Sequence, residues 1–242
     1  MRCLVISDIH ANFPALQTVL VDAQPFDAVW CLGDLVGYGP NPNRCIERLL
    51  DFSLTCIAGN HDWGAIGRAD LYVFNRDARQ ALYWTQNELT PENRAFLSDL
   101  PTTAKIDDFF LAHGSPRDPI WEYTVDLKTV TENFQTFDAR VALVGHTHIP
   151  VLFEWVETNK QVRVLLPDWE EPIHLDERRL IVNPGSVGQP RDGNPRASYG
   201  ILDTEARTWE SRRVTYPVEI TQEQMRARGL PQRLIDRLEL GR

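Results

Sequence analysis

Histidine and aspartate side chains recur in this sequence directly after short apolar runs. Five of the six histidines stand at such positions, together with three aspartates and one asparagine. These residues are Asp8, His10, Asp34, Asn60, His61, Asp62, His113, His146 and His148. Carboxylate, amide and imidazole groups are ligands that metal ions take from proteins. The sixth histidine, His174, lies outside this pattern and is interpreted as a solvated loop residue.

The type of donor narrows the choice of metal. A mixture of oxygen and imidazole donors favours Mn, Fe or Zn, with Ni or Co as alternatives, over Ca²⁺, which prefers oxygen ligands alone. About eight candidate donors are too many for one tetrahedral site. Two metals about 3.5–4 Å apart that share a carboxylate would use such a set. The pattern therefore indicates a centre with two transition metal ions.

Each of these residues also has a simple structural explanation when it is taken alone. Asp34 follows a glycine and can cap a turn, and Asn60 tolerates the left-handed backbone of a turn. A single histidine such as His113 is more often a buried, hydrogen-bonded side chain than a ligand. The metal interpretation therefore depends on whether the whole set converges.

The elements that must position these residues begin with three apolar runs, at 2–7, 27–32 and 54–58, which are typical of buried parallel strands. Helices are predicted between them, from Asn12 to about residue 23 and over about 43–51. This alternation predicts a parallel sheet with right-handed crossovers. Because sites in open α/β sheets form beyond the carboxyl ends of the strands, the polar residues can meet there.

The pattern of predicted elements in the rest of the chain changes near residue 150. Before it, we expect two helices over 75–98 broken before Pro91, a helix near 126–135, and strands at 106–112 and 141–144. After it, short β-like runs predict a more antiparallel sheet packed on the first. These runs are 151–156, 162–166, 179–182, 197–203 and 208–214. The acidic segment 167–177 is predicted to be a surface loop, and 220–239 to form one or two helices. We predict one α/β domain over 1–242, with a C-terminal helical segment at about 220–242.

Composition restricts the possible partners and the compartment. The net charge of −9 argues against broad binding to a nucleic-acid backbone. No apolar run approaches the roughly 20 residues that span a bilayer, and the first residues do not resemble a signal peptide. The four cysteines lack CxxC spacing, which favours buried free thiols in a reducing cytoplasm. We therefore expect a cytoplasmic protein that binds neither membrane nor nucleic acid, and no feature indicates an oligomer.

Five blocks of the sequence together resemble the calcineurin-like metallophosphoesterases. The blocks are Asp8-Ile-His10, Gly33-Asp34, Gly59-Asn60-His61-Asp62, His113 before a glycine, and Gly145-His146-Thr-His148. They occur in the order of that family across residues 8–148, and Asn183-Pro-Gly-Ser186 is similar to its bacterial members of this size. The resemblance implies a two-sheet β-sandwich flanked by helices, with mixed parallel and antiparallel strands and a dinuclear metal centre. The longer helical segment 63–105 and the acidic insertion 157–178 depart from the smallest bacterial members, which leaves the substrate open.

The resemblance also implies a role for each residue. Asp8, His10 and His148 would hold one metal, Asn60, His113 and His146 would hold the other, and Asp34 would bridge them. His61 would be catalytic and face the leaving group, and Asp62 would orient it. The implied reaction is hydrolysis of a small phosphate ester by in-line attack of a hydroxide that bridges the two metals. A phosphodiester is favoured over a phosphomonoester as the substrate.

Two other functions are compatible with the same fold. One is a catalytically idle scaffold for protein interactions, against which the intact His61 and ligand positions count. The other is a nuclease, against which the acidic charge and the absence of Lys/Arg-rich runs count.

The sequence leaves the roles of several further residues open. Arg191 can hold a phosphate oxygen through its planar guanidinium or form a surface ion pair with Asp192. Tyr38 and Trp63 can stack on a base or aryl leaving group, or pack in the core. Asn12 can orient phosphate or only cap its helix. The apolar residues of 220–242 can pack on the core, which we favour, or on a partner.

Overall fold

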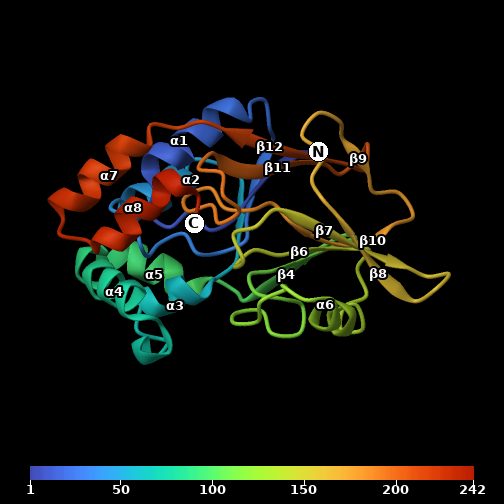
Figure 1. The fold of residues 1–242 in the computed structure, drawn as a ribbon, viewed down its shortest axis with the longest axis horizontal. Coiled ribbons are helices and arrows are strands. Elements are labelled where there is room, and N and C mark those ends of the chain that lie inside the picture. Colours follow the sequence, from blue (N-terminus) through green and yellow to red (C-terminus); the bar gives the residue numbers. More distant parts are fainter.

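The computed structural model describes residues 1–242 as two six-stranded sheets packed face to face, with helices on their outer sides (Figure 1). The strands are β1 (Arg2–Ile6), β2 (Ala28–Cys31), β3 (Leu54–Cys56), β4 (Thr103–Ile106), β5 (Phe109–Ala112), β6 (Val141–Leu143), β7 (Val151–Val156), β8 (Gln161–Leu165), β9 (Ile173–His174), β10 (Arg179–Asn183), β11 (Ala197–Asp203) and β12 (Thr208–Val214). The helices are α1 (Phe13–Asp22), α2 (Pro42–Leu49), α3 (Asn60–Ala65), α4 (Arg76–Glu88), α5 (Pro91–Asp99), α6 (Leu127–Asn133), α7 (Val218–Ala227) and α8 (Gln232–Leu240), with the short 3₁₀ helix η1 (Leu71–Val73). None of these helices is long and apolar enough to cross a bilayer.

The first sheet has the strand order β3-β2-β1-β11-β12-β9. Its first three strands are parallel, as the alternation of strands and helices predicts, and the other three pair antiparallel. Alternate residues of β1 face opposite ways. Leu4 and Ile6 pack with the helices, while Cys3 and Val5 pack against the second sheet. The strand is apolar throughout because both of its faces are covered.

The second sheet has the order β4-β5-β6-β10-β7-β8. Strands β5, β6 and β10 are parallel to one another, and β4, β7 and β8 pair antiparallel at the two sides. Each sheet therefore contains one set of three parallel strands. The two-sheet arrangement with mixed strands and flanking helices agrees with the predicted fold class.

Three local predictions were wrong. The strands after residue 150 do not form a sheet of their own: β7, β8 and β10 join the second sheet, and β9, β11 and β12 join the first. The run 106–112 is not one strand, because Asp107, at φ 49°, makes the two-residue turn of the β4–β5 hairpin. The segment 167–177 is not all loop, because Ile173–His174 pairs with β12. His174 is exposed, as predicted, but on this short strand.

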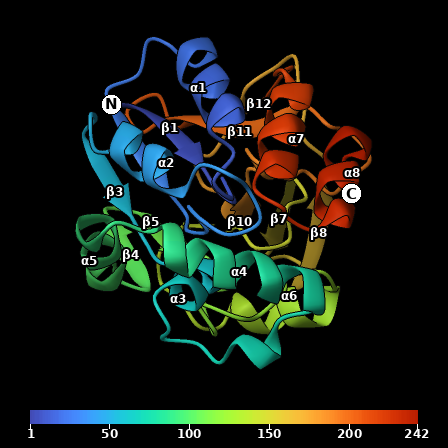
Figure 2. The same cartoon turned by 90° about the vertical axis from the view of Figure 1, so that its left-hand side faces the viewer.

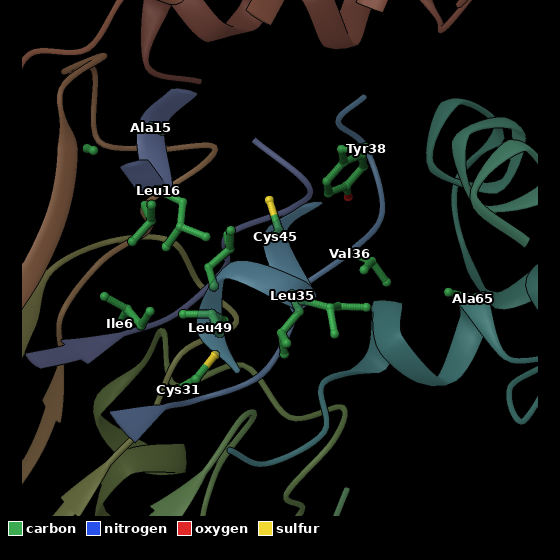
Figure 3. Packing of buried hydrophobic residues seen from close by; sticks show 14 of the residues in the cluster. Ile6, Ala15, Leu16, Cys31, Leu35, Val36, Tyr38, Cys45, Leu49 and Ala65 are labelled. Atoms are coloured by element: carbon green, nitrogen blue, oxygen red, sulfur yellow. The ribbon is translucent and has the colours of Figure 1, made fainter. Parts of the chain in front are cut away.

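Three apolar clusters hold the layers together. The largest lies between the first sheet and the helices, where Ile6 and Cys31 face Leu16, Cys45 and Leu49 (Figure 3). A second cluster fills the space between the sheets, and the third lies under α6 on the outer face of the second sheet. All four cysteines are buried and free, as predicted.

Helices α7 and α8 lie beside α1 and above α4 on the same side of the molecule (Figure 2). Five apolar residues of this C-terminal segment belong to the largest cluster and are at most 5% exposed, whereas Ile220 and Leu240 are exposed. The five buried residues are Met225, Leu230, Leu234, Ile235 and Leu238. The C-terminal segment therefore packs on the core of its own chain.

Candidate metal centre

The polar residues singled out in the sequence lie in loops that follow the parallel strands of both sheets. Asp8 and His10 follow β1, Asp34 follows β2, and α3 begins with Asn60 directly after β3. In the second sheet, His113 follows β5, and the segment 145–148 follows β6. Donor residues from both sheets lie in contact with one another. The carboxyl ends of the parallel strands of the two sheets therefore lie at the same edge of the molecule.

The donor atoms form two main groups. One contains Asp8, His10 and His148, and the other contains Asp34, His113 and His146; within each, the ligand atoms all lie within 4.8 Å of one another. Asn60 adjoins the second group, with its Oδ1 3.2 Å from Nε2 of His113. Each group takes donors from both sheets. All of these residues are buried, at 5% exposure or less.

Asp34 lies between the two groups. Its Oδ2 atom is 3.6 Å from Nε2 of His10 and 3.3 Å from Nε2 of His113. This oxygen is buried and has no hydrogen-bond partner, whereas Oδ1 accepts a hydrogen bond from the backbone N–H of His61 at 2.8 Å. One carboxylate oxygen is thus available to both groups at once.

Backbone carbonyl groups orient three of the histidine rings. The Nδ1 contacts are His10 to Val36 O at 3.1 Å, His113 to Leu32 O at 2.8 Å and His148 to Gln189 O at 2.6 Å. When Nδ1–H donates to a carbonyl, Nε2 carries the lone pair and can bind a metal. The Nε2 atoms of His10 and His148 are only 3.2 Å apart. Two lone pairs aimed at the same small space fit a cation there.

Burial keeps most of these imidazoles neutral. It lowers the pKa of His10 and of His148 well below the usual value, and that of His146 to about 3. For His113, burial also disfavours the cation, but the carboxylate of Asp34 beside it prevails and raises the pKa to about 9. Burial in turn disfavours the Asp34 carboxylate, and the neighbouring imidazoles, led by His113, hold its pKa well below its usual range. The metal-free centre therefore attracts positive charge to Asp34.

The backbone at the centre is strained. Five of the donors have left-handed φ angles, which residues with a side chain rarely adopt. These are Asp8 at 53°, His10 at 48°, Asp34 at 54°, His146 at 65° and His148 at 63°. Such conformations cost about 1–3 kcal/mol each and persist where the surrounding structure enforces them, as at ligand sites.

Residues 1–207 match the family model of the calcineurin-like phosphoesterase superfamily domain. The chain belongs to this superfamily. It is 44% identical to a metallophosphoesterase from Sphaerobacter thermophilus, whose crystal structure superposes with a TM-score of 0.92 over 100% of this chain and 99% of the other. The family resemblance in the five sequence blocks is thereby confirmed.

Two curated relatives are also similar over most of their length. An uncharacterized protein of Methanocaldococcus jannaschii is 39% identical over 98% of this chain and 97% of its own. The phosphodiesterase YfcE of Escherichia coli K12 is 28% identical over 85% of this chain and 89% of its own. This superfamily depends on metal ions, in keeping with the clustered donors described above.

In this superfamily member, Asp62 acts on the backbone rather than on the ring of His61. Its carboxylate accepts hydrogen bonds from the N–H groups of Gly59 at 2.9 Å, Asp34 at 2.8 Å and Val36 at 3.2 Å. It thus ties the loop after β2 to the start of α3. Asp62 makes no hydrogen bond to the His61 ring, whose Nδ1 is buried without a partner.

Packing positions the His61 ring instead. Its centroid lies 4.3 Å from that of Tyr38, 4.9 Å from that of His10 and 5.0 Å from that of Phe74. Tyr38 is only 6% exposed and also lies 4.6 Å from His10. It therefore packs against the centre, as one of its two sequence interpretations proposed.

Glycines allow the loops to approach one another closely. A Cβ on Gly59 would lie 2.1 Å from Oδ1 of Asp34, and one on Gly145 would lie 1.9 Å from Oγ of Ser7. Gly59 has an extended backbone, with φ −105° and ψ 175°. It is therefore the approach of the Asp34 side chain, not a positive φ angle, that requires glycine at this position.

The block Asn183-Pro-Gly-Ser186 supports the donor loops from beneath. The Asn183 amide donates to Gly145 O at 2.7 Å and to Thr147 Oγ1 at 3.0 Å. The Ser186 hydroxyl donates to Asp8 O at 2.8 Å. The sequence drew attention to this block by family resemblance, but its contacts with the loops of the centre appear only in the structure.

The remaining open residues divide into structural and site-facing groups. Asn12 caps α1 through Ala15 N–H and donates to Gly188 O, which satisfies its side chain without a ligand. Trp63 is partly buried against the largest apolar cluster. Asp192 pairs with Arg213, so it does not form the ion pair with Arg191 that the sequence suggested.

Two side chains lie at the accessible side of the centre. Arg191 donates to Gln189 Oε1 at 2.9 Å and to Tyr38 Oη at 3.4 Å, and its Nε is buried without a partner. Tyr123 stacks on His146, with centroids 3.9 Å apart, and is 47% exposed. No sequence pattern indicated Tyr123, because it lies in an irregular segment far from the five blocks.

Proposed function

We propose that this protein is a phosphoester hydrolase with two metal ions in its active site. The observation that carries the proposal is the position of Asp34 Oδ2, unpartnered and within 3.6 Å of histidine nitrogens from both donor groups. A carboxylate oxygen shared in this way is the arrangement by which two cations are held close together.

The residues present fit such a pair of metals. Asp8, His10 and His148 would hold one ion, Asn60, His113 and His146 the other, and Asp34 both. Buried polar atoms without partners support this assignment, since leaving them unpaired is costly: they include Asp8 Oδ1 and Asp34 Oδ2. The mixed oxygen and nitrogen donors favour Mn, Fe or Zn, with Ni or Co as alternatives.

When bound, two such ions activate water as a nucleophile and neutralise negative charge on the phosphoryl group. The chain's own residues would do the rest. His61 would donate a proton or hydrogen bond to the departing oxygen, its ring held by Tyr38 and Phe74. Asp62 would keep the Asp34 loop in place through the backbone N–H groups it binds. Arg191 would contact a phosphoryl oxygen through its planar guanidinium.

The preferred substrate is a small phosphodiester rather than a monoester or a nucleic acid. The relative from Escherichia coli is named a phosphodiesterase, which supports the diester. The net charge of −9 disfavours a nucleic acid. We also propose that residues 1–242 form one domain, because α7 and α8 share the core of the first sheet.

Metal analysis of the purified protein, followed by hydrolysis of bis-p-nitrophenyl phosphate with Mn²⁺, tests this function. We expect release of p-nitrophenolate that is lost after chelation and restored by metal. Bound metals without hydrolysis of any diester or monoester would contradict the enzyme and favour a scaffold. Cleavage of plasmid or single-stranded DNA would contradict the small substrate.

A further inference from the structure

A cavity with several arginines in its lining lies away from the donor residues. It has a volume of about 760 Å³ and lies between the start of α4 and helix α8, which Figure 2 shows on the same side of the molecule. Its lining includes four arginines and two aspartates, Arg76, Arg233, Arg237, Arg242, Asp77 and Asp236. The cavity is therefore locally cationic in a chain whose net charge is −9.

None of these four arginines forms an ion pair with an Asp or Glu side chain, although two carboxylates line the same cavity. Arg237 Nε donates a hydrogen bond to Arg242 O, and Asp77 is near enough for its charge to act on Arg237. Asp236 accepts a hydrogen bond from Gln232 instead. Arg233 and Arg237 are four residues apart on α8, a spacing at which like charges repel on a helix. An anion in the cavity would offset this repulsion.

The cavity adjoins the surroundings of the donor centre: Asn75 and Arg76 of its lining follow Phe74, whose ring centroid lies 5.0 Å from that of His61. Leu238, next to Arg237, lines a small cavity together with His10 and Tyr38. Arg191, which donates to Tyr38, is near enough to Arg237 for its charge to act on it: burial, followed by the charge of Arg191, lowers the pKa of Arg237 to about 10. Arg237 on α8 is thus within electrostatic range of Arg191, which contacts Tyr38 beside the centre.

We propose that this cavity binds a second anionic group of the substrate, held by Arg233, Arg237 and Arg76. The inference rests on the proposed phosphoesterase function and specifies its substrate class. The substrate would carry one phosphoester at the donor centre and a further phosphate or similar anion in the cavity. Guanidinium groups recognise phosphate oxygens through paired hydrogen bonds, which suits this ligand.

A matched pair of chromogenic diesters tests the proposal on the metal-loaded enzyme. The two compounds are thymidine 5′-(p-nitrophenyl phosphate) and its 3′-phosphorylated form, which share the leaving group and differ only in the second phosphate. We expect kcat/KM to be at least about tenfold higher for the 3′-phosphorylated compound, the effect of one charge-assisted hydrogen bond. In Arg233→Gln and in Arg237→Gln, the ratio of the two kcat/KM values should fall towards one.

Arg226→Gln is the control, because Arg226 is exposed on α7 and lies outside the cavity. This variant should keep the wild-type ratio. Equal use of both compounds by the wild type, or a preference that survives both α8 substitutions, would overturn the subsite while leaving the phosphoesterase function intact.

Isothermal calorimetry with thymidine 3′,5′-bisphosphate and thymidine 5′-monophosphate tests the anion subsite independently of the phosphoesterase function. If neither diester is hydrolysed, the phosphoesterase function fails, and the subsite is still tested by binding. We expect the bisphosphate to bind at least about tenfold more tightly than the monophosphate, and Arg233→Gln to remove that difference. Equal affinities in the wild type would overturn the subsite.

Discussion

The donor centre and the arginine-lined cavity are built in opposite ways. The centre is almost fully buried, its backbone is strained at five donors, and its side chains come from loops of both sheets. The cavity is open, and its arginines lie on the start of α4, on α8 and at residue 242. The centre lies within the 207 residues that match the superfamily model, and α8 lies beyond them. The contrast separates a rigid part, in which we place the chemistry, from an open part, in which we place the recognition of a second anion.

The strongest test of the rigid part is Asp34→Ala. Because Asp34 Oδ2 adjoins both donor groups, we expect the loss of both metals and a fall in kcat/KM of at least about 10³-fold. Metal analysis and diester hydrolysis measure the two effects. Asp51→Ala, which removes an exposed carboxylate paired with Arg48, is the matched control and should change neither. Two tightly bound metals in the Asp34 variant would refute the shared ligand.

His61→Ala separates catalysis from metal binding. Its imidazole is proposed to serve the departing oxygen, so kcat should fall by about 10²–10⁴-fold while the metal content stays near that of the wild type. Steady-state kinetics and metal analysis on the same preparation check this outcome. Since His61 also lies within 4.8 Å of the His10 and Asp34 donor atoms, loss of metal would instead make it a ligand.

Gly59→Ala tests whether close packing fixes the donors. The new methyl group would meet Asp34 Oδ1 at 2.1 Å, so the carboxylate must move, and metal affinity should fall by about 10–100-fold. Gly67→Ala is the control, because nothing lies within 4 Å of its added Cβ. That control should lose only stability, since its φ of 77° disfavours alanine. Equal metal affinity in both variants would contradict the packing argument.

The smallest expected effect is a pH dependence of the folding stability of the metal-free protein. Burial raises the pKa of Asp8 from 3.8 to about 7, and the charge of Asp34 raises that of His113 from 6.5 to about 9 against the effect of burial. In both cases the folded state binds more protons than the unfolded state. Below about pH 7 this effect is opposed, because the lowered pKa values of His10, His146 and His148 make the unfolded state bind more protons there. Above it these imidazoles are neutral in both states, so stability is lost as pH rises from about 7 to 9. The loss should be of the order of 1 kcal/mol per pH unit.

Thermal unfolding of the protein after metal removal by a chelator measures this loss of stability. The same scan with added Mn²⁺ measures how far the metal restores stability. Metals replace the bound protons, so their stabilising effect should grow with pH. A metal-free melting temperature that rises from pH 7 to 9 would contradict the assignment.

The sequence predicted the elements that depend on local patterns. The apolar runs at β1 to β3 and the cap at Asn12 gave strands and a helix near their observed bounds. The five motif blocks gave the superfamily, and the structure brings their donors together. The roles of the individual donors, the number of metals and the diester preference stay predictions.

The sequence could not predict features that depend on distant neighbours. The strands after residue 150 divide between two sheets according to their pairing with β1 and β6, which no local pattern encodes. The left-handed φ of His146 is imposed by its surroundings rather than by its residue type. The cavity unites Arg76 with Arg233, which are far apart in the chain.

Because each donor group takes residues from both sheets, the spacing between the sheets sets the size of both proposed metal sites. The apolar residues between the sheets, such as Trp30 and Trp209, therefore act as spacers for a centre that they do not touch. A smaller side chain there would change the distances between the donor atoms and hence the metal that is preferred. If the proposed metals bind there, their selectivity depends on core residues as well as on the ligands.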